Sequence, residues 1–154
     1  YKTIQNKFHY AITGNTAAEI VYNRVDSKKE NMGLTTWENS PDGKILKSDV
    51  IIAKNYLNEQ EIKNLNNLVN LFLDIAENNA ERSITMYMED WKNEVENALK
   101  VFHYEVLEGK GKISHKQAVE KAENEYEKYK IIQDKNYVSD FDRLLSETKQ
   151  IENK

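Results

Sequence analysis

The sequence predicts an all-α fold, a helical bundle with one small β-hairpin near residues 34–46. The 154 residues contain only one proline and five glycines, so few positions interrupt a helix. Apolar residues recur every three or four positions along most of the chain, which is the period of an amphipathic helix. Residue pairs with capping-box spacing precede several of these periodic stretches. These observations favour helices as the main elements.

The first two predicted elements are helices joined by a short turn. An apolar face runs from Tyr1 to Ile12, and Gly14-Asn15 then ends the first helix, because both residues tolerate a positive φ angle. The segment Thr16-Ala-Ala-Glu19 has capping-box spacing, so a second helix is expected to start there and to continue to Arg24.

The stretch from residue 27 to 47 is irregular and contains the predicted hairpin. Leu34–Trp37 and Lys44–Leu46 flank the segment Pro41-Asp42-Gly43. That segment is a turn signal, because proline fixes φ, aspartate can bond to the backbone, and glycine leaves φ free. A two-stranded hairpin alone is marginal in water, so it is expected to lean on the helices.

Further helices are predicted in the remainder of the chain. Asn58–Glu61 and Ser114–Gln117 have capping-box spacing, and Gly109–Gly111 breaks the chain between them. Phe72 and Trp91 stand in the middle of the two strongest apolar stripes and are expected to be buried. The four stripes are Ile62, Leu65, Val69, Phe72 and Ala76; Met88, Trp91, Val95, Leu99, Phe102 and Val106; Ala118, Ala122, Tyr126 and Tyr129; and, after a start at Ser139, Phe141, Leu144, Leu145 and Ile151.

Composition and charge exclude several classes of protein. The chain has no cysteine, which excludes a disulfide scaffold, a thiol nucleophile and a zinc ribbon. No apolar run approaches the roughly 18 residues that span a bilayer. The formal net charge is −4, and basic residues are scattered among acidic ones rather than gathered in a stripe. We therefore expect no nucleic-acid partner for this domain and no membrane span.

Several short motifs, in one order along the chain, resemble the RhuM family of bacterial virulence proteins. The resemblance implies a bacterial, cytoplasmic protein. Family members usually carry an N-terminal segment of DNA-binding character, and this chain begins at Tyr1 within a helical pattern, so it is interpreted as a fragment of a longer protein. The motifs are Gln5-Asn6-Lys7 with His9, Thr16-Ala17-Ala18-Glu19, Tyr22-Asn23-Arg24, Asn31-Met32-Gly33-Leu34-Thr35-Thr36, Lys47-Ser48-Asp49, Ala53-Lys54-Asn55-Tyr56-Leu57-Asn58-Glu59, Tyr87-Met88 and Gly111-Lys112-Ile113-Ser114.

The first turn carries a second resemblance. His9, followed after four residues by Gly14-Asn15, is similar to the Fic/Doc motif. That likeness implies a Fic-like helical core with His9 as general base for a protein hydroxyl, and a turn that cradles the phosphates of ATP at a helix N-terminus. The chain departs from the pattern at Thr13, where the family has a magnesium-binding acid, at Ala17, where it has a phosphate-binding arginine, and at Tyr10-Ala11. These changes remove two stabilisers of phosphoryl transfer.

Each candidate residue also has a purely structural interpretation. His9 can cap its own helix, and Gly14-Asn15 can simply end that helix. The charged candidates can form structural ion pairs, and no metal site is expected. The candidates are His9 as a catalytic base; Gly14, Asn15, Thr16, Ala17 and Glu19 as a nucleotide or anion site; and Arg24, Trp37, Lys47, Asp49 and Lys54 as contacts to a substrate or partner.

Two functions follow from these alternatives. The favoured one is a non-catalytic domain that binds a protein partner or a second copy of itself, with a vestigial phosphate-binding turn. The other is a nucleotide-dependent transferase that moves AMP or phosphate from ATP to a protein hydroxyl. In both cases residues 1–154 are expected to form one helical domain, with a Fic-like core over 1–108 and C-terminal helices over 112–154.

Overall fold

The computed structural model describes residues 2–137 and 140–153, so Tyr1 and Ser139, two expected helix positions, lie outside the described residues. The described residues form helices, turns and loops without a β-strand, which confirms the all-α prediction. The elements in chain order are α1 (Lys2–Thr13), α2 (Ala17–Arg24), the short 3-10 helices η1 (Glu30–Gly33) and η2 (Ala53–Tyr56), α3 (Glu59–Glu81), α4 (Met88–Val101), α5 (His115–Asn136) and α6 (Asp140–Glu152).

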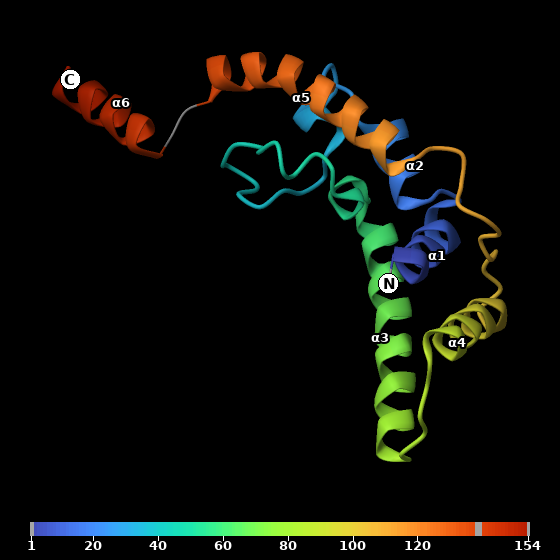
Figure 1. The fold of residues 1–154 in the computed structure, drawn as a ribbon. Helices are drawn as coiled ribbons and strands as arrows, with labels where there is room; N and C mark the ends of the chain where they lie inside the picture. The colour runs from blue at the N-terminus through green and yellow to red at the C-terminus, as the bar shows by residue number, and fades with distance from the viewer. Residues whose placement is uncertain (1, 138–139, 154) are drawn as a thin grey trace.

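The helices form an elongated arrangement with a bend at the first two helices. Figure 1 shows α3 running away from this bend in one direction, with α1 and α4 beside it. In the other direction α5 packs along α2, and the loop between η1 and η2 lies under α5. The turn between α1 and α2 therefore lies where the two halves of the molecule meet.

Side chains cap three of the helices as the sequence predicts. The side chain of Thr16 accepts from the Glu19 N–H in front of α2, and Asn58 and Glu61 form the same reciprocal pair in front of α3. Ser114 and Gln117 do so for α5. Each pair satisfies two backbone donors that have no partner inside their helix, so these start positions follow from local sequence.

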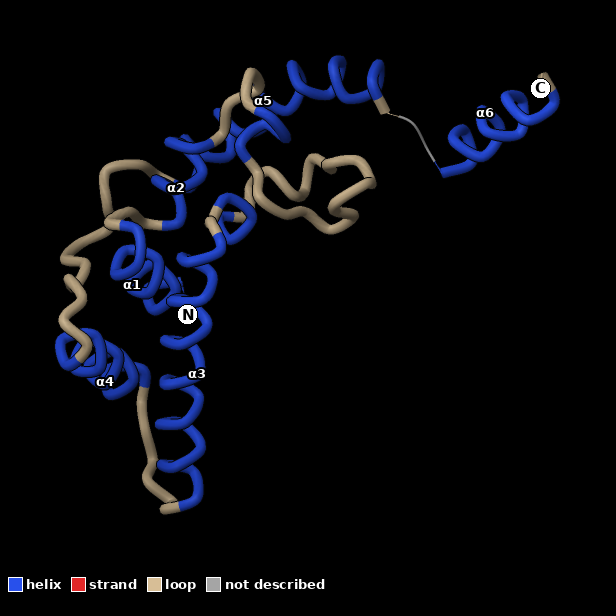
Figure 2. Tube along the Cα trace, turned by 180° about the vertical axis from the view of Figure 1, so that it is seen from behind, coloured by secondary structure: helices blue, strands red, loops and turns tan. Residues whose placement is uncertain are grey.

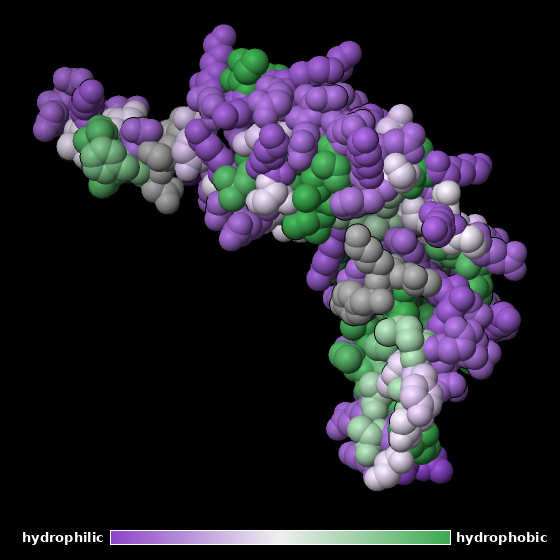
Figure 3. All heavy atoms as spheres, in the orientation of Figure 1, coloured by the Kyte–Doolittle hydropathy of each residue, from purple (hydrophilic) through white to green (hydrophobic). Residues whose placement is uncertain are grey.

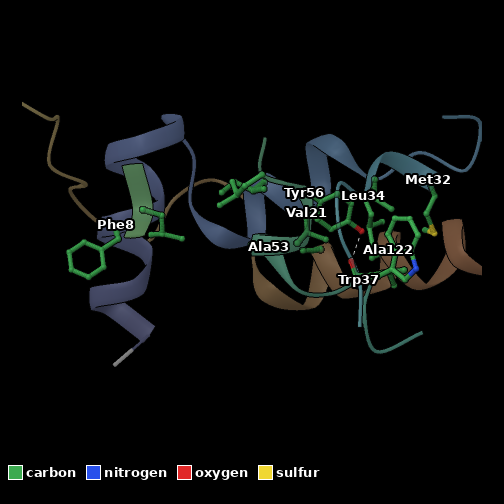
Figure 4. Close-up of a cluster of buried hydrophobic side chains, with 14 of the residues drawn as sticks. Phe8, Val21, Met32, Leu34, Trp37, Ala53, Tyr56 and Ala122 are labelled. Carbon is green, nitrogen blue, oxygen red and sulfur yellow. Dashed lines mark hydrogen bonds between the residues drawn. The ribbon is translucent and has the colours of Figure 1, made fainter. Parts of the chain in front are cut away.

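The core is one continuous cluster that reaches from α1 to α5. Figure 4 shows Phe8 at one end of this cluster and Met32 and Trp37 at the other, with side chains of α2, η2 and α5 between them. In its buried middle the Tyr56 hydroxyl donates to the Val50 carbonyl at 2.5 Å. Helix α5 contributes Ala122 to this core, so the C-terminal helices are not all peripheral. The division of the chain at residues 108–112 stays a prediction.

The expected hairpin over residues 34–46 is wrong. This segment consists of turns, because groups outside it occupy the backbone positions that a strand ladder would need. The Gln133 side chain accepts from the Ile45 N–H at 2.7 Å and donates to the Ile45 carbonyl at 3.0 Å. The Asp49 carboxylate accepts from the Leu46 N–H, and the Asn55 carbonyl accepts from the Thr35 N–H at 2.7 Å. Tertiary contacts thus replaced the local pairing.

The expected burial of Phe72 and Trp91 is only partly correct. Both side chains are only partly buried, and their rings contact each other at a centroid distance of 5.2 Å. The C-terminal end of α3 extends beyond α1 and α4, and the buried residues of α3, Leu65 and Leu68, both lie in its first half. Helix α4 ends at Val101, and the expected continuation of its stripe to Val106 lies outside the helix.

Helix α6 stands apart from the other helices in both ribbon views (Figures 1 and 2). Its apolar side chains are exposed, and Figure 3 shows hydrophobic atoms on the outer surface of this helix. Among the described residues, no helix combines the length and the apolar character needed to cross a membrane.

Candidate functional site

The turn between α1 and α2 is built by backbone geometry and one threonine. Gly14 has a φ of +76°, and its N–H donates to the Tyr10 carbonyl at 2.8 Å, which ends α1. The Thr13 hydroxyl donates to the His9 carbonyl at 2.7 Å and accepts from the Asn15 N–H at 3.1 Å. Thr13, which stands where the Fic motif has an acid, thus serves the turn itself.

The N–H groups of Thr16, Ala17 and Glu19 at the start of α2 already have acceptors within this chain. The Thr16 N–H donates to the Glu19 carboxylate at 2.9 Å, and the Glu19 N–H donates to the Thr16 hydroxyl at 3.3 Å. The Ala17 N–H donates to the side-chain carbonyl of Asn6 at 3.2 Å. A phosphate at this position would have to displace these acceptors and approach the negative charge of Glu19.

A glycine from the loop before α5 covers the same helix start. Gly111 has a φ of +82°, and a Cβ atom on it would lie 2.6 Å from the Thr16 side chain and 3.0 Å from the Glu19 carboxylate. Thr16 is accordingly only 1% exposed. The sequence predicted Thr16 and Glu19 as anion-site residues, whereas in the structure their polar atoms face each other and the Gly111 backbone.

His9 lies on α1 and is half-buried, with its two ring nitrogens in different surroundings. Its Nδ1 donates to the Gln5 carbonyl at 2.7 Å, which leaves the lone pair of a neutral imidazole on Nε2. Nε2 is buried and has no hydrogen-bond partner among the residues that the structure describes. Burial lowers the pKa of His9, although the bond to Gln5 opposes this effect. A substrate hydroxyl could reach Nε2 only after the surrounding side chains moved.

We expect ATP with magnesium to leave the amide resonances of Thr16, Ala17 and Glu19 unchanged up to millimolar concentration. The reason is that their N–H groups are occupied and a carboxylate stands beside them. The measurement is an amide NMR titration, with Glu19→Ala as the variant that frees the Thr16 N–H. Saturable shifts in the wild type, together with AMP transfer that His9→Ala abolishes, would instead support the transferase.

Arg24 joins the end of α2 to the start of α3. Its guanidinium donates to both carboxylate oxygens of Glu61, at 2.7 and 2.9 Å, and to the Tyr56 carbonyl at 3.0 Å. This hydrogen bond lowers the pKa of Glu61 and raises that of Arg24. Glu61 also completes the cap of α3, so Arg24 is engaged in a structural network and offers no free charge to a substrate.

Trp37 and Asp49, two of the predicted contact residues, are both buried. Trp37 is 8% exposed, and its indole N–H donates to the Gly43 carbonyl at 2.8 Å, so it belongs to the core. Asp49 is 3% exposed, and its carboxylate accepts from the backbone N–H groups of Glu38 and Leu46 at 3.2 and 2.7 Å. Asp49 therefore organises the loop between η1 and η2.

Lys47 and Lys54 are the predicted contact residues that lie on the surface. Lys47 is 3.7 Å from Glu127 of α5, in a pair whose two side chains are more than half exposed. Lys54 is exposed, and within the described part of the chain its ammonium group has no acceptor. The structure thus gathers residues 9–19 at one turn but distributes the other candidates over α2, the loop and η2.

The sequence interpretation missed Asn6 and Lys7 as parts of this turn region. The Asn6 side-chain carbonyl accepts a hydrogen bond from the Ala17 N–H. Lys7 is 4% exposed, and its ammonium donates to Glu96 at 2.7 Å and to the Leu107 carbonyl at 3.2 Å, which ties α1 to α4 and to the following loop. Their place in a family-like motif with His9 was the available signal.

The polar residues on the remaining surface between α2 and α5 also bond to one another. Lys121 donates to the Tyr22 carbonyl at 2.5 Å and lies over the Tyr22 ring, and Glu125 accepts from the Ser27 N–H at 3.0 Å. Tyr22, Lys121 and Glu125 line a shallow groove. Across residues 2–137 and 140–153 no cluster of three His, Asp or Glu residues could hold a metal ion.

Comparison with known proteins gives one match. The model of the Virulence protein RhuM family matches residues 1–138. The chain belongs to this family. No curated protein and no solved structure matches it. The family match spans α1 to α5, which confirms the resemblance seen in the motifs, and it ends before α6.

Several residues of the family-like motifs have structural roles in this RhuM-family chain. Asn6 and Lys7, Thr16 and Glu19, and Gly111 all meet around the α1–α2 turn. The family match names no reaction, substrate or partner.

Proposed function

We propose that this RhuM-family chain is a non-catalytic interaction domain, in which the turn between α1 and α2 is a vestige and α6 is the docking element. The observation that carries the proposal is the exposed apolar face of α6. Phe141, Leu144, Leu145 and Ile151 are between 45% and 74% exposed. They recur at helical spacing, so they share one side of the helix.

Such a helix needs a partner for physical reasons. Isolated helices shorter than about 12–15 residues are marginal in water, because nucleation is unfavourable and no tertiary contact compensates it. Helix α6 has 13 residues and stands apart from the other helices. An amphipathic helix of this kind typically gains its stability when its apolar side enters a complementary surface.

The interpretation of the α1–α2 turn as a vestige has separate support. The backbone N–H groups of Thr16, Ala17 and Glu19 donate to acceptors within the chain, and a Cβ atom on Gly111 would meet the Thr16 and Glu19 side chains. Neither Thr13 nor Ala17 supplies the charge that a transferred phosphoryl group needs. A transferase would need an accessible base beside free backbone N–H groups. These contacts provide no such arrangement.

Site-specific photo-crosslinking in cells that produce the protein tests the proposal. A photoreactive amino acid at Leu144 reports on the apolar face, and the same amino acid at Ser146 reports on the opposite, polar face as the matched control. We expect discrete adducts from position 144 and none from position 146. Equal labelling at both positions, or none at position 144, would contradict the docking role of α6.

A further inference from the structure

We propose that α6 of one copy docks on an apolar patch of a second copy, so that two chains exchange their last helices. The docking surface, called here the 44–54 patch, is the exposed side of residues 44–54, which contain the exposed apolar residues Leu46, Ile51 and Ile52 and the lysines at 44, 47 and 54. This inference rests on the proposed function and deepens it, because it names the partner that the exposed face of α6 fits.

The 44–54 patch presents apolar side chains from a fixed turn. Leu46, Ile51 and Ile52 are 37%, 37% and 46% exposed. The turn beneath them is held by Asp49, whose N–H donates to the Leu46 carbonyl at 3.0 Å and whose carbonyl accepts from the Ile52 N–H at 3.3 Å. The buried Asp49 carboxylate also accepts from the Leu46 N–H. The backbone of the patch is therefore set before any partner arrives.

The charges of α6 and of the patch are opposite. Residues 140–152 contain four acidic and two basic residues, a formal net charge of −2, with Glu147 and Glu152 among the acids. Residues 44–54 contain three lysines and one aspartate, a formal net charge of +2. Because Asp49 is buried and bonded, the exposed charge of the patch comes from its lysines, of which Lys44 is paired with Asp134 and Lys47 loosely with Glu127. An acidic amphipathic helix thus meets an apolar surface with a basic rim.

Two lysines of the patch, Lys47 and Lys54, retain capacity for a partner, whereas Lys44 is paired with Asp134. Lys54 has no acceptor for its ammonium group among the described residues, and Lys47 has only the loose, exposed contact with Glu127 at 3.7 Å. Exposed pairs of that kind contribute little stability and exchange readily. Contacts from Glu147 and Glu152 of an arriving helix could therefore form without breaking a strong ion pair.

The geometry favours a second copy over the chain's own α6. Ile45 is tied to Gln133 by two hydrogen bonds, and Lys44 is paired with Asp134 at 2.8 Å, so the patch is fixed to the C-terminal half of α5. Figures 1 and 2 both show α6 leading away from this end of α5. Under two-fold symmetry each copy supplies one helix and one patch, so both complementary surfaces are covered.

Direct pairing of two α6 helices fits the charges less well. Glu147 lies beside the apolar face, at the third position after Leu144. In a parallel or antiparallel pair of these net-acidic helices, like charges approach each other, which opposes association. The 44–54 patch provides the opposite charge that the helix lacks.

Sedimentation equilibrium of the full chain with two charge-reversed variants tests the inference. Lys47→Glu with Lys54→Glu makes the patch acidic, and Glu147→Lys with Glu152→Lys makes α6 basic. We expect a wild-type dimer and about tenfold or greater weakening in each variant alone. An equimolar mixture of the two variants should dimerise again, because both helix–patch contacts in the mixed dimer are then complementary. Lys63→Glu with Lys116→Glu, which makes the same charge change elsewhere on the surface, should leave the dimer intact.

The outcomes separate this inference from the proposed function. Restored dimerisation in the mixture supports exchange between copies, since docking within one chain could not be rescued by mixing. The inference is overturned if the chain is monomeric at all concentrations. It is also overturned if the patch variants leave the dimer dissociation constant unchanged. If position 144 then still crosslinks to a different protein, the interaction domain stands with another partner. If position 144 crosslinks to nothing, both proposals fail.

Discussion

Replacement of Gly33 by alanine is expected to lower the free energy of unfolding by about 4 kcal/mol, because two penalties add at this position. Gly33 has a φ of +91°, which side chains rarely adopt, and an added Cβ atom would lie 2.3 Å from the Arg24 carbonyl oxygen. That oxygen belongs to the backbone at the end of α2 and cannot move aside like the end of a flexible side chain. Urea denaturation monitored by circular dichroism measures the loss.

Gly109→Ala is the matched control for this prediction. Gly109 has a similar φ of +85°, but no atom lies within 4 Å of the position that its Cβ would occupy. It therefore carries the conformational penalty alone, about 1 kcal/mol. Equal effects of the two substitutions would show that the approach of Gly33 to Arg24 does not contribute to stability.

Leu99→Ala should be the second most damaging single change, with a loss of about 3 kcal/mol or more. Leu99 on α4 is 0% exposed and faces Phe8, Leu68 and Val95 from α1, α3 and α4, where α4 closes the core. Truncation removes apolar contacts and leaves a cavity that these helices can fill only in part. The midpoint of urea denaturation should fall while its slope stays constant.

Val101→Ala two residues later supplies the comparison. Val101 belongs to the same helix but is 73% exposed, so the substitution should change stability by no more than about 0.5 kcal/mol. A loss at Val101 as large as that at Leu99 would mean that the exposed end of α4 is covered in solution.

The helices and their starts were predictable because their causes are local. Thr16 with Glu19, Asn58 with Glu61, and Ser114 with Gln117 satisfy backbone donors within four residues, so sequence spacing alone identifies them. The left-handed Gly14 that ends α1 is equally local. Membership in the RhuM family was readable in the same way, from short motifs in a fixed order.

The interpretation of the first turn required the tertiary structure, because residues far apart in sequence complete it. Asn6 and Gly111 approach the start of α2 from α1 and from the loop before α5. The sequence showed the turn but gave no sign that its N–H groups were occupied. A helix N-terminus binds an anion only when its donors are free.

The failed hairpin has the same physical origin. Pro41-Asp42-Gly43 is a local turn signal. However, the side chain of Gln133, 88 residues away from Ile45, forms hydrogen bonds with both the N–H and the carbonyl of Ile45. The sequence by itself determined the helices, their caps and the amphipathic character of α6, since each depends on neighbours within about two turns. Only the tertiary structure decided that Trp37 and Asp49 are buried and that Leu46, Ile51 and Ile52 face outward, because burial depends on which distant segments cover a residue.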